Sequence, residues 1–349
     1  MTNDRLRPGS DLAVVIPFFQ RSPGILARTV RSALAQKGID GFRIVVVDDA
    51  SPVSGRVELA EFLQDAPDRV LLVEQANTGA AGARNKGLDS LPEGTRFVAF
   101  LDSDDEWVPD HLANALFALR SGVDFYFADF HQLGQSVSAF ERAKRIDVTQ
   151  HPLLDGATTI REFRGDMVNQ IIAGNILGTS VTAYAYHKMP DLRFRLGFRH
   201  TGEEYLFWLD LALRSDRIAF GDRPECRYGS GVNIYSDSAW GQEKYLTITI
   251  DDIKYRRRML EEFQLSPAQR RLLKARIRQL RGSFTLGLLH HLRTHGRLPS
   301  RAVLRDYVAQ DPSYPLTVWP AALGATFAKA KTWSARWSRS SSKSEDSSA

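Results

Sequence analysis

The sequence has few of the features that mark specialised protein classes. It contains a single cysteine, Cys226, among 349 residues, so no intramolecular disulfide can form. Its 25 glycines and 15 prolines are ordinary numbers, which excludes collagen-like and low-complexity chains. With 43% apolar and 25% charged residues, the composition is that of a globular protein with a large core, and disorder of the whole chain is excluded.

Long hydrophobic runs are also missing. A membrane-spanning helix needs about 18 or more largely apolar residues in succession, and the nearest candidate, 167–187, is interrupted by polar residues such as Asn169, Gln170 and Asn175. Residues 1–11 are polar and lack the apolar segment of a signal peptide. We therefore expect a cytoplasmic protein.

Positive charge is unevenly distributed. The net charge is only +5, but residues 254–305 contain 14 Lys or Arg and two acids, Glu261 and Glu262, whereas the rest of the chain carries −7. Such a block is typical of a surface that meets an anionic partner, for example a phosphate-bearing substrate, a nucleic acid or a membrane. A solvated helical surface is an equally good interpretation.

The N-terminal third alternates short apolar runs with helical patterns. The apolar runs are continuous, as expected for strands that are covered on both faces. They are 12–17, 43–48, 70–74, 97–102 and 124–129, and the helical patterns between them are 23–36, 54–64, 80–90 and 109–121. This alternation predicts an α/β fold with a mostly parallel, Rossmann-like sheet.

The remaining chain is less regular. We expect a strand near 179–186, a helix over 203–214 and a basic helical region from 239 to about 307. The chain accordingly divides into a flexible N-terminus (1–10), an α/β domain (11–235), a basic helical extension (236–315) and a segment rich in Trp and basic residues with a disordered, Ser-rich tail (316–349).

Acidic residues follow two of the expected strands, at the sheet edge where parallel sheets bind ligands. Asp102 and Asp104 stand two residues apart after the fourth strand, so both carboxylates can reach one divalent cation. Hard oxygen ligands of this kind suit Mg²⁺ or Mn²⁺. The alternative is an acidic loop that caps the helix beginning near residue 109.

Asp48 and Asp49 close the second strand, where an acid often binds a ribose, although an Asx turn with Ser51 explains them equally well. The small residues of 77–87 form a loop-to-helix junction at which backbone can approach an anion and Arg84 can add charge. The junction lacks both the Gly-x-Gly-x-x-Gly pattern of dinucleotide binders and the Gly-Lys-Ser/Thr of a P-loop. Dehydrogenase and NTPase functions are therefore disfavoured.

Four spaced motifs together resemble the family 2 glycosyltransferases of GT-A fold, over residues 11 to about 215. They are Val14-Val-Ile-Pro17-Phe-Phe, Val46-Val-Asp48-Asp49-Ala-Ser51, Asn77-x-Gly79-x-x-x-Ala83-Arg84-Asn85-x-Gly87 and Phe100-Leu-Asp102-Ser-Asp104-Asp105. Within the family, the chain looks most similar to bacterial exopolysaccharide glucosyltransferases of the succinoglycan type. The resemblance implies a nucleotide-diphospho-sugar donor and an inverting mechanism. The donor-binding residues that it implies are Pro17, Asp48, Asp49, Arg84, Asp102 and Asp104, the last two through a divalent metal.

An inverting transfer needs a general base that takes the proton of the acceptor hydroxyl. The family places it in a Gly-Glu-Asp motif that opens a helix, and Gly202-Glu203-Glu204 matches this motif with Glu204 in place of the Asp. An Arg that commonly follows in that helix is absent, and Asp210 stands near its place. On the residues alone, an acidic first turn of an amphipathic helix is the simpler interpretation.

The resemblance predicts transfer of glucose from UDP-glucose to a lipid-linked oligosaccharide in exopolysaccharide biosynthesis. One alternative is a nucleotidyltransferase, but the sequence has no glycine-rich basic loop after residue 17. The other is a protein that binds nucleic acid through its basic helices, but the sequence has no familiar nucleic-acid-binding module. We therefore expect no nucleic-acid partner. Trp319, Trp333 and Trp337 stand among Lys and Arg, as in interfacial segments. One interpretation is peripheral binding to the inner membrane surface, and the alternative is that these tryptophans pack on the catalytic domain.

Overall fold

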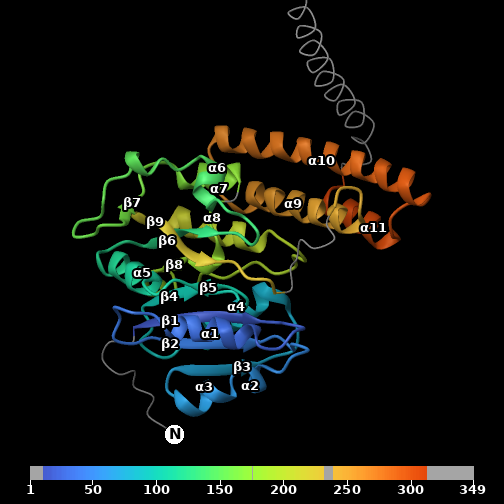
Figure 1. The fold of residues 1–349 in the computed structure, drawn as a ribbon. Helices are drawn as coiled ribbons and strands as arrows, with labels where there is room; N and C mark the ends of the chain where they lie inside the picture. The colour runs from blue at the N-terminus through green and yellow to red at the C-terminus, as the bar shows by residue number, and fades with distance from the viewer. Residues whose placement is uncertain (1–10, 175, 232–238, 313–349) are drawn as a thin grey trace, which may run out of the picture. The chain divides into compact units, whose positions relative to one another are not determined.

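A computed structural model describes residues 11–174, 176–231 and 239–312, which form two compact units. Residues 11–197 and 203–231 belong to the first unit. Residues 198–202 and 239–312 belong to the second. The chain therefore enters the second unit for five residues, returns to the first, and enters the second again. Figure 1 shows the elements of each unit.

The first half of the sheet is parallel. Strands β1 (Leu12–Phe18), β2 (Arg43–Asp48), β3 (Val70–Glu74) and β4 (Phe97–Phe100) are ordered β3-β2-β1-β4. Alternate residues of β2 belong to different apolar clusters: Ile44 and Val46 join the main core, whereas Val45 and Val47 pack with Ala83. Because both faces are covered, the strands are apolar throughout, as predicted.

The second half of the sheet is mixed. Strand β8 (Ala183–Tyr184) pairs antiparallel with β4 and β6 (Phe125–His131), and β9 (Ile218–Arg227) lies parallel to β6. Two further short strands, β5 (Glu106–Trp107) and β7 (Ile160–Glu162), pair antiparallel with β9. The parallel arrangement expected from the sequence thus covers β3-β2-β1-β4, and antiparallel pairs extend it.

The helices of the first unit cover this sheet (Figure 1). They are α1 (Ile25–Leu34), α2 (Gly55–Glu58), α3 (Ala60–Asp65), α4 (Gly79–Asp89), α5 (His111–Arg120), α6 (Ala139–Ala143), α7 (Met167–Ala173) and α8 (Glu203–Arg214), with 3-10 turns at Val148–Gln150, Thr179–Val181 and Tyr186–Lys188. The α8 prediction is confirmed. The single helix expected over 54–64 is wrong: Leu59 leaves the helical region, with ψ of 3°, and separates α2 from α3.

Helix α4 packs closely on β1. A Cβ atom added to Gly87 would lie 2.4 Å from Cγ1 of Val15, well inside van der Waals contact. Glycine at this position lets the helix backbone approach the strand. This approach packs α4, which carries Arg84 in its second turn, on β1 and β2.

The second unit is helical, as predicted. It contains α9 (Glu243–Glu262), α10 (Pro267–His295) and α11 (Arg301–Gln310), and α9 packs on both of the others (Figure 1). Its core joins apolar residues of all three helices, including Ile250, Phe284 and Tyr307. Among the described residues, no helix is both long and apolar enough to cross a bilayer. The predicted Trp-rich segment with Trp319, Trp333 and Trp337 lies outside the described residues.

Residues 198–202 are built into the second unit by specific contacts. The backbone N–H groups of Arg199 and His200 both donate hydrogen bonds to Oδ2 of Asp251 on α9, at 3.1 and 2.9 Å. Gly202 has a φ of 126° and lies against Phe198 and Tyr255. The segment is thus anchored to α9 immediately before the chain begins α8 at Glu203.

Candidate active site

The carboxyl ends of the parallel strands bring together acidic residues from separate loops of the first unit. Asp102 follows β4, and the loop turns tightly behind it, because the N–H of Asp105 donates to the carbonyl of Asp102 at 3.0 Å. This turn directs Asp104 and Asp105 back toward the segment 228–231 that follows β9. The sheet edge predicted to hold ligands is therefore the acidic edge of this unit.

Arg84 lies at the centre of the cluster. Its guanidinium is 3% exposed, and Nη2 lies 2.6 Å from Oδ1 of Asp102. Nη1 lies 3.8 Å from Oε1 of Glu203 and 4.0 Å from Oε1 of Glu204. Burial lowers the pKa of Arg84, but the three carboxylates outweigh it and hold this pKa above its usual range. The structure thus brings three predicted site residues together, Arg84, Asp102 and Glu204, from three distant parts of the chain.

The loop before α8 supports Arg84 from the side. Asn85 forms two backbone hydrogen bonds with Phe194, donating from Nδ2 to its carbonyl and accepting at Oδ1 from its N–H, both at 2.8 Å. These bonds hold the Phe194 ring 5.2 Å from the centre of the Arg84 guanidinium, within the range of a cation–π contact. Asn85 of the predicted motif therefore positions an aromatic ring beside the buried cation.

The two glutamates that open α8 have different environments. Glu203 is 9% exposed, and burial, together with the charge of Glu204, raises its pKa well above the usual range, against the opposing effect of Arg84. Its Oε2 has no hydrogen-bond partner among the described residues. The side chain of Glu204 is 21% exposed and so remains open to solvent. Of the two, Glu204 is the carboxylate that a substrate hydroxyl could reach.

Asp210, which stands near the place of the missing helix Arg, makes ion pairs away from the Arg84 cluster. Its carboxylate bonds Arg195 and Arg214, each at 2.7 Å. The pair with Arg195 ties α8 to the loop that carries Phe194, and the pair with Arg214 lies within the helix. The residue therefore stabilises the support of the site.

Asp104 and Asp105 are held by the backbone after β9. Oδ2 of Asp104 accepts from the N–H of Gly231 at 2.9 Å, and Oδ1 of Asp105 accepts from the N–H of Gly229 at 3.0 Å. A Cβ atom at either glycine would overlap Asp104, so the approach requires glycine. Ser180 completes the support: its hydroxyl donates to Asp105 at 2.5 Å and accepts from the N–H of Asp102 at 3.0 Å.

The electrostatics of this loop favour a bound cation. Burial and the nearby charge of Asp102 raise the pKa of Asp104 to about 6, and the same two causes raise that of Asp105. In the part of the chain that the structure describes, no group of three or more Asp, Glu, His or Cys side chains is arranged to hold a metal. Mg²⁺, however, is commonly held by one or two carboxylates together with substrate phosphates and water. Asp102 and Asp104 fit that donor set.

Asp48 and Asp49 are buried at the end of β2 and already accept protein hydrogen bonds. Asp48 accepts from the N–H groups of Ser51 and Gly55, both at 2.8 Å. Asp49 accepts from the N–H of Gly79, also at 2.8 Å, and so satisfies the first turn of α4. Both therefore shape the loops around the sheet edge. Pro17, at the end of β1, is opposite Val47 in the sheet and is buried.

Several residues of this site belong to no recognisable sequence motif. Ser180 and Phe194 are single residues of irregular segments, and each reaches the site only through the tertiary fold. The glycines of Tyr228-Gly-Ser-Gly could have been found, because closely spaced glycines often mark a close backbone approach. That signal alone would not have indicated which loop they contact.

The comparisons with known proteins identify the family of the chain. The family model described as glycosyl transferase family 2 matches residues 13–190. The chain belongs to this family. It is therefore a glycosyltransferase, which decides against the nucleotidyltransferase alternative. The succinoglycan biosynthesis protein ExoW of Rhizobium meliloti is 34% identical over 233 residues, which cover 64% of this chain and 70% of that protein.

A second relative matches a shorter part. The Escherichia coli protein WfgD, named as a UDP-Glc:alpha-D-GlcNAc-diphosphoundecaprenol beta-1,3-glucosyltransferase, is 32% identical over 120 residues, 34% of this chain and 45% of that protein.

Solved structures of two other proteins show the same fold. Staphylococcus aureus TarS in complex with UDP-GlcNAc matches with a TM-score of 0.54 at 18% identity, covering 88% of this chain and 81% of that chain. The mannosyltransferase PcManGT of Pyrobaculum calidifontis, in complex with GDP-Man and Mn²⁺, matches with a TM-score of 0.55 at 17% identity, covering 91% and 88%. The first unit is thus a GT-A-like α/β fold, as predicted.

Proposed function

We propose that this glycosyltransferase acts with inversion, using Glu204 as the general base, on a nucleotide-diphospho-sugar bound at the acidic sheet edge. The observation that supports this proposal is the cluster of Arg84 with Asp102 and Glu204, in which a donor-binding acid and a solvent-open carboxylate share one buried cation. Under this proposal, the site of the leaving group and the proton acceptor lie within one small region.

The chemistry follows from these positions. The Glu204 carboxylate takes the proton of an acceptor hydroxyl, and the resulting oxygen nucleophile attacks the anomeric carbon of the donor. The bond from that carbon to the diphosphate oxygen breaks, and the nucleoside diphosphate leaves on the opposite face. Glu203, whose pKa is raised by burial, stays beside Arg84 and limits the movement of the guanidinium.

At the donor end, Asp102 and Asp104 would hold Mg²⁺ or Mn²⁺, which when bound neutralises the charge of the leaving diphosphate. Arg84 orients Asp102 through their 2.6 Å ion pair. Asp48 would meet the nucleoside with the lone pairs that its hydrogen bonds from Ser51 and Gly55 leave available, since a carboxylate has about four acceptor positions. Asp49 already accepts three hydrogen bonds at Oδ1, from Gln75 and Thr78, and one at Oδ2, from Gly79, so it would meet the nucleoside through Oδ2. Pro17 would border the same end of the site.

The names of the relatives suggest the substrates. ExoW is named for succinoglycan biosynthesis, and WfgD for glucose transfer from UDP-Glc to a diphosphoundecaprenol-linked sugar. On this basis we propose glucose transfer from UDP-glucose to a lipid-linked oligosaccharide, in exopolysaccharide biosynthesis, at the cytoplasmic face of the inner membrane.

A screen of nucleotide-sugars tests the donor. UDP-glucose with Mn²⁺ should raise the melting temperature of the protein and be slowly hydrolysed, and EDTA should abolish both effects. The variant Asp104→Asn should lose both while keeping its fold by circular dichroism. If UDP-glucose has no effect with any divalent cation whereas another nucleotide-sugar stabilises the protein, the glucose assignment is wrong. Unchanged hydrolysis in EDTA would remove the proposed metal.

A further inference from the structure

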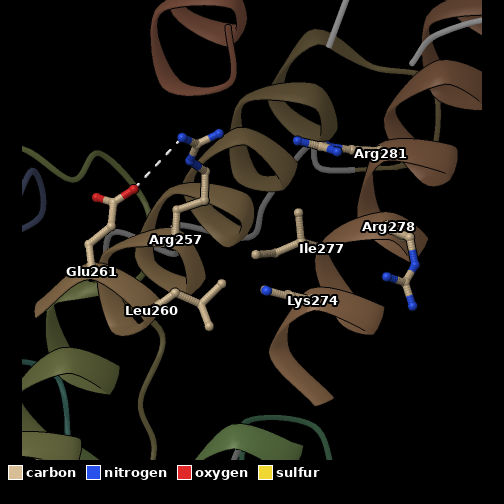
Figure 2. Close-up of a pocket in the computed structure, with 7 residues that line it drawn as sticks. All are labelled: Arg257, Leu260, Glu261, Lys274, Ile277, Arg278 and Arg281. Atoms are coloured by element: carbon tan, nitrogen blue, oxygen red, sulfur yellow. Dashed lines mark ion pairs between the residues drawn. The ribbon is translucent and has the colours of Figure 1, made fainter. Parts of the chain in front are cut away.

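A basic pocket opens between two helices of the second unit. It has a volume of about 340 Å³ and is lined by α9 and α10. Its lining residues are Arg257, Leu260, Glu261, Lys274, Ile277, Arg278 and Arg281. Figure 2 shows Arg257 and Arg281 extending from the two helices toward each other, with Lys274 pointing into the space beside Leu260 and Ile277. The volume lies at the small end of the range for ligand sites, roughly 300 to 1,000 Å³.

Two of the four cations are fixed by one buried carboxylate. Asp311, whose side chain is 1% exposed, accepts from Nε and Nη2 of Arg281, both at 2.6 Å, and from Nη1 of Arg257 at 3.0 Å. Two guanidinium groups therefore share a single negative charge. The second carboxylate near Arg257 is Glu261, at 3.7 Å, and it is 62% exposed, so this pair is weak.

The other two cations add charge that the described residues do not neutralise. Lys274 and Arg278 are exposed on α10, one turn apart, and neither makes an ion pair within the residues that the structure describes. With Asp311 and Glu261 included, the pocket carries a formal charge of +2. Because Arg257 and Arg281 are already fixed, little side-chain conformational freedom is lost when an anion binds.

We propose that this pocket binds a phosphoryl group, as a diphosphate or a phosphate ester whose apolar neighbour lies on Leu260 and Ile277. Guanidinium groups suit phosphate because they donate paired hydrogen bonds in a planar fork, and Lys274 adds a mobile point charge. Buried Ile277 and half-buried Leu260 supply an apolar wall that a phospholipid or polyprenyl phosphate would use and a free phosphate would not. The proposal does not depend on the transfer reaction of the first unit.

Binding of defined probes to the full chain tests the proposal. The probes are inorganic diphosphate and monomeric dihexanoyl phosphatidic acid, measured by isothermal titration calorimetry at constant ionic strength. The test variant is Lys274→Gln with Arg278→Gln. The matched control is Arg276→Gln with Arg293→Gln, which removes two exposed charges from the same helix outside the pocket. Donor-dependent hydrolysis of UDP-glucose in each variant reports separately on the catalytic site.

We expect the wild type and the control to bind at least one probe with the same affinity, and the test variant to bind it at least about tenfold more weakly, since charge-assisted hydrogen bonds are lost. Tighter binding of the phosphatidic acid would identify a lipid as the source of the phosphate, and equal binding a free phosphate. The proposal is overturned if neither probe binds, or if the test and control variants weaken binding equally.

Discussion

Glu203 and Glu204 stand side by side at the start of α8, yet burial gives them different chemistry. The carboxyl group of Glu203 is enclosed next to Arg84, where burial raises its pKa and keeps a substrate hydroxyl from reaching it. Glu204 shares the same cation but keeps contact with solvent. One position along the chain thus separates a structural carboxyl group from a proposed catalytic one.

Removing the proton acceptor without changing its shape tests this separation. Glu204→Gln should lower kcat by about 10² to 10⁴ with nearly unchanged donor affinity, because a general base acts in the transition state. The matched variant Glu203→Gln should lower kcat by less than about tenfold. Steady-state transfer kinetics and donor titration measure both. If Glu203→Gln has the larger effect on kcat, the base is Glu203.

The raised pKa of Asp104 has a consequence for stability. Between the usual Asp value near 3.9 and about 6, folded protein binds more protons than unfolded protein, so the free energy of unfolding falls as pH rises through this window. Without metal, we expect a loss on the order of 1 to 3 kcal/mol between pH 4 and pH 7 from this group. Asp104→Asn should flatten this part of the profile.

Urea unfolding at pH 4, 5, 6 and 7 in EDTA measures the effect. The difference between wild type and Asp104→Asn isolates the contribution of the one carboxyl group from those of other titrating residues. Parallel pH profiles for the two proteins would contradict the assignment. Added Mn²⁺ should restore stability to the wild type above pH 6 and leave Asp104→Asn unaffected.

The position of Arg84 depends on how closely helix α4 packs on strand β1. Gly87→Ala should destabilise the protein by about 1 to 3 kcal/mol, because the new methyl group overlaps Val15. In the double variant Gly87→Ala with Val15→Ala the overlap is relieved, so the two effects should not add. Denaturant unfolding of the four proteins of this cycle gives the coupling. If the effects of the two substitutions on the free energy of unfolding simply add, α4 can move away from β1 at this point without cost.

The elements that the sequence predicted well are those with strong local patterns. Strands β1, β2 and β3 are continuous apolar runs, and α8 has an acidic first turn and a buried apolar face. Strand β9 was not predicted, because it contains Gly221, Pro224 and several charged residues. It pairs with β6 through register shifts around Asp129, which tertiary packing determines and local propensity does not.

In the candidate site, the residues that belong to sequence motifs were predicted, and the residues outside motifs were not. Arg84, Asp102 and Glu204 belong to motifs, and the structure brings Asp102 to 2.6 Å and Glu204 to 4.0 Å from the Arg84 guanidinium. The roles of Asp48 and Asp49 in binding a donor stay predictions. Ser180 and Phe194 could not have been predicted, because their function lies in contacts across 75 or more residues of sequence.

The excess of positive charge is concentrated in the helices α9 to α11 and the residues after them. Each Lys or Arg near an anionic bilayer contributes roughly 1 kcal/mol, so several together can hold a protein at the surface without a spanning helix. We expect the full chain to sediment with vesicles of phosphatidylglycerol at low salt, and to be released at high salt.

Neutral phosphatidylcholine vesicles and a chain truncated after residue 313 serve as controls. The truncated chain should bind more weakly, because it lacks Trp319, Trp333 and Trp337 with their basic neighbours. Equal, salt-insensitive sedimentation of both chains would rule out docking by this segment. If salt releases both chains and they bind the vesicles equally well, the helices α9 to α11 carry the binding instead.

The five residues 198–202 restrict how this molecule can have been assembled in evolution. They are anchored to Asp251 and Tyr255 of the helical unit, yet they stand directly before the proposed base in the catalytic unit. If a gene fusion joined these helices to another catalytic unit only at residue 239, Asp251 and Tyr255 would not meet the residues 198–202 that they contact here. Exchange of the helical unit together with this anchor therefore requires three crossovers in the gene, before residue 198, before Glu203 and before the helices.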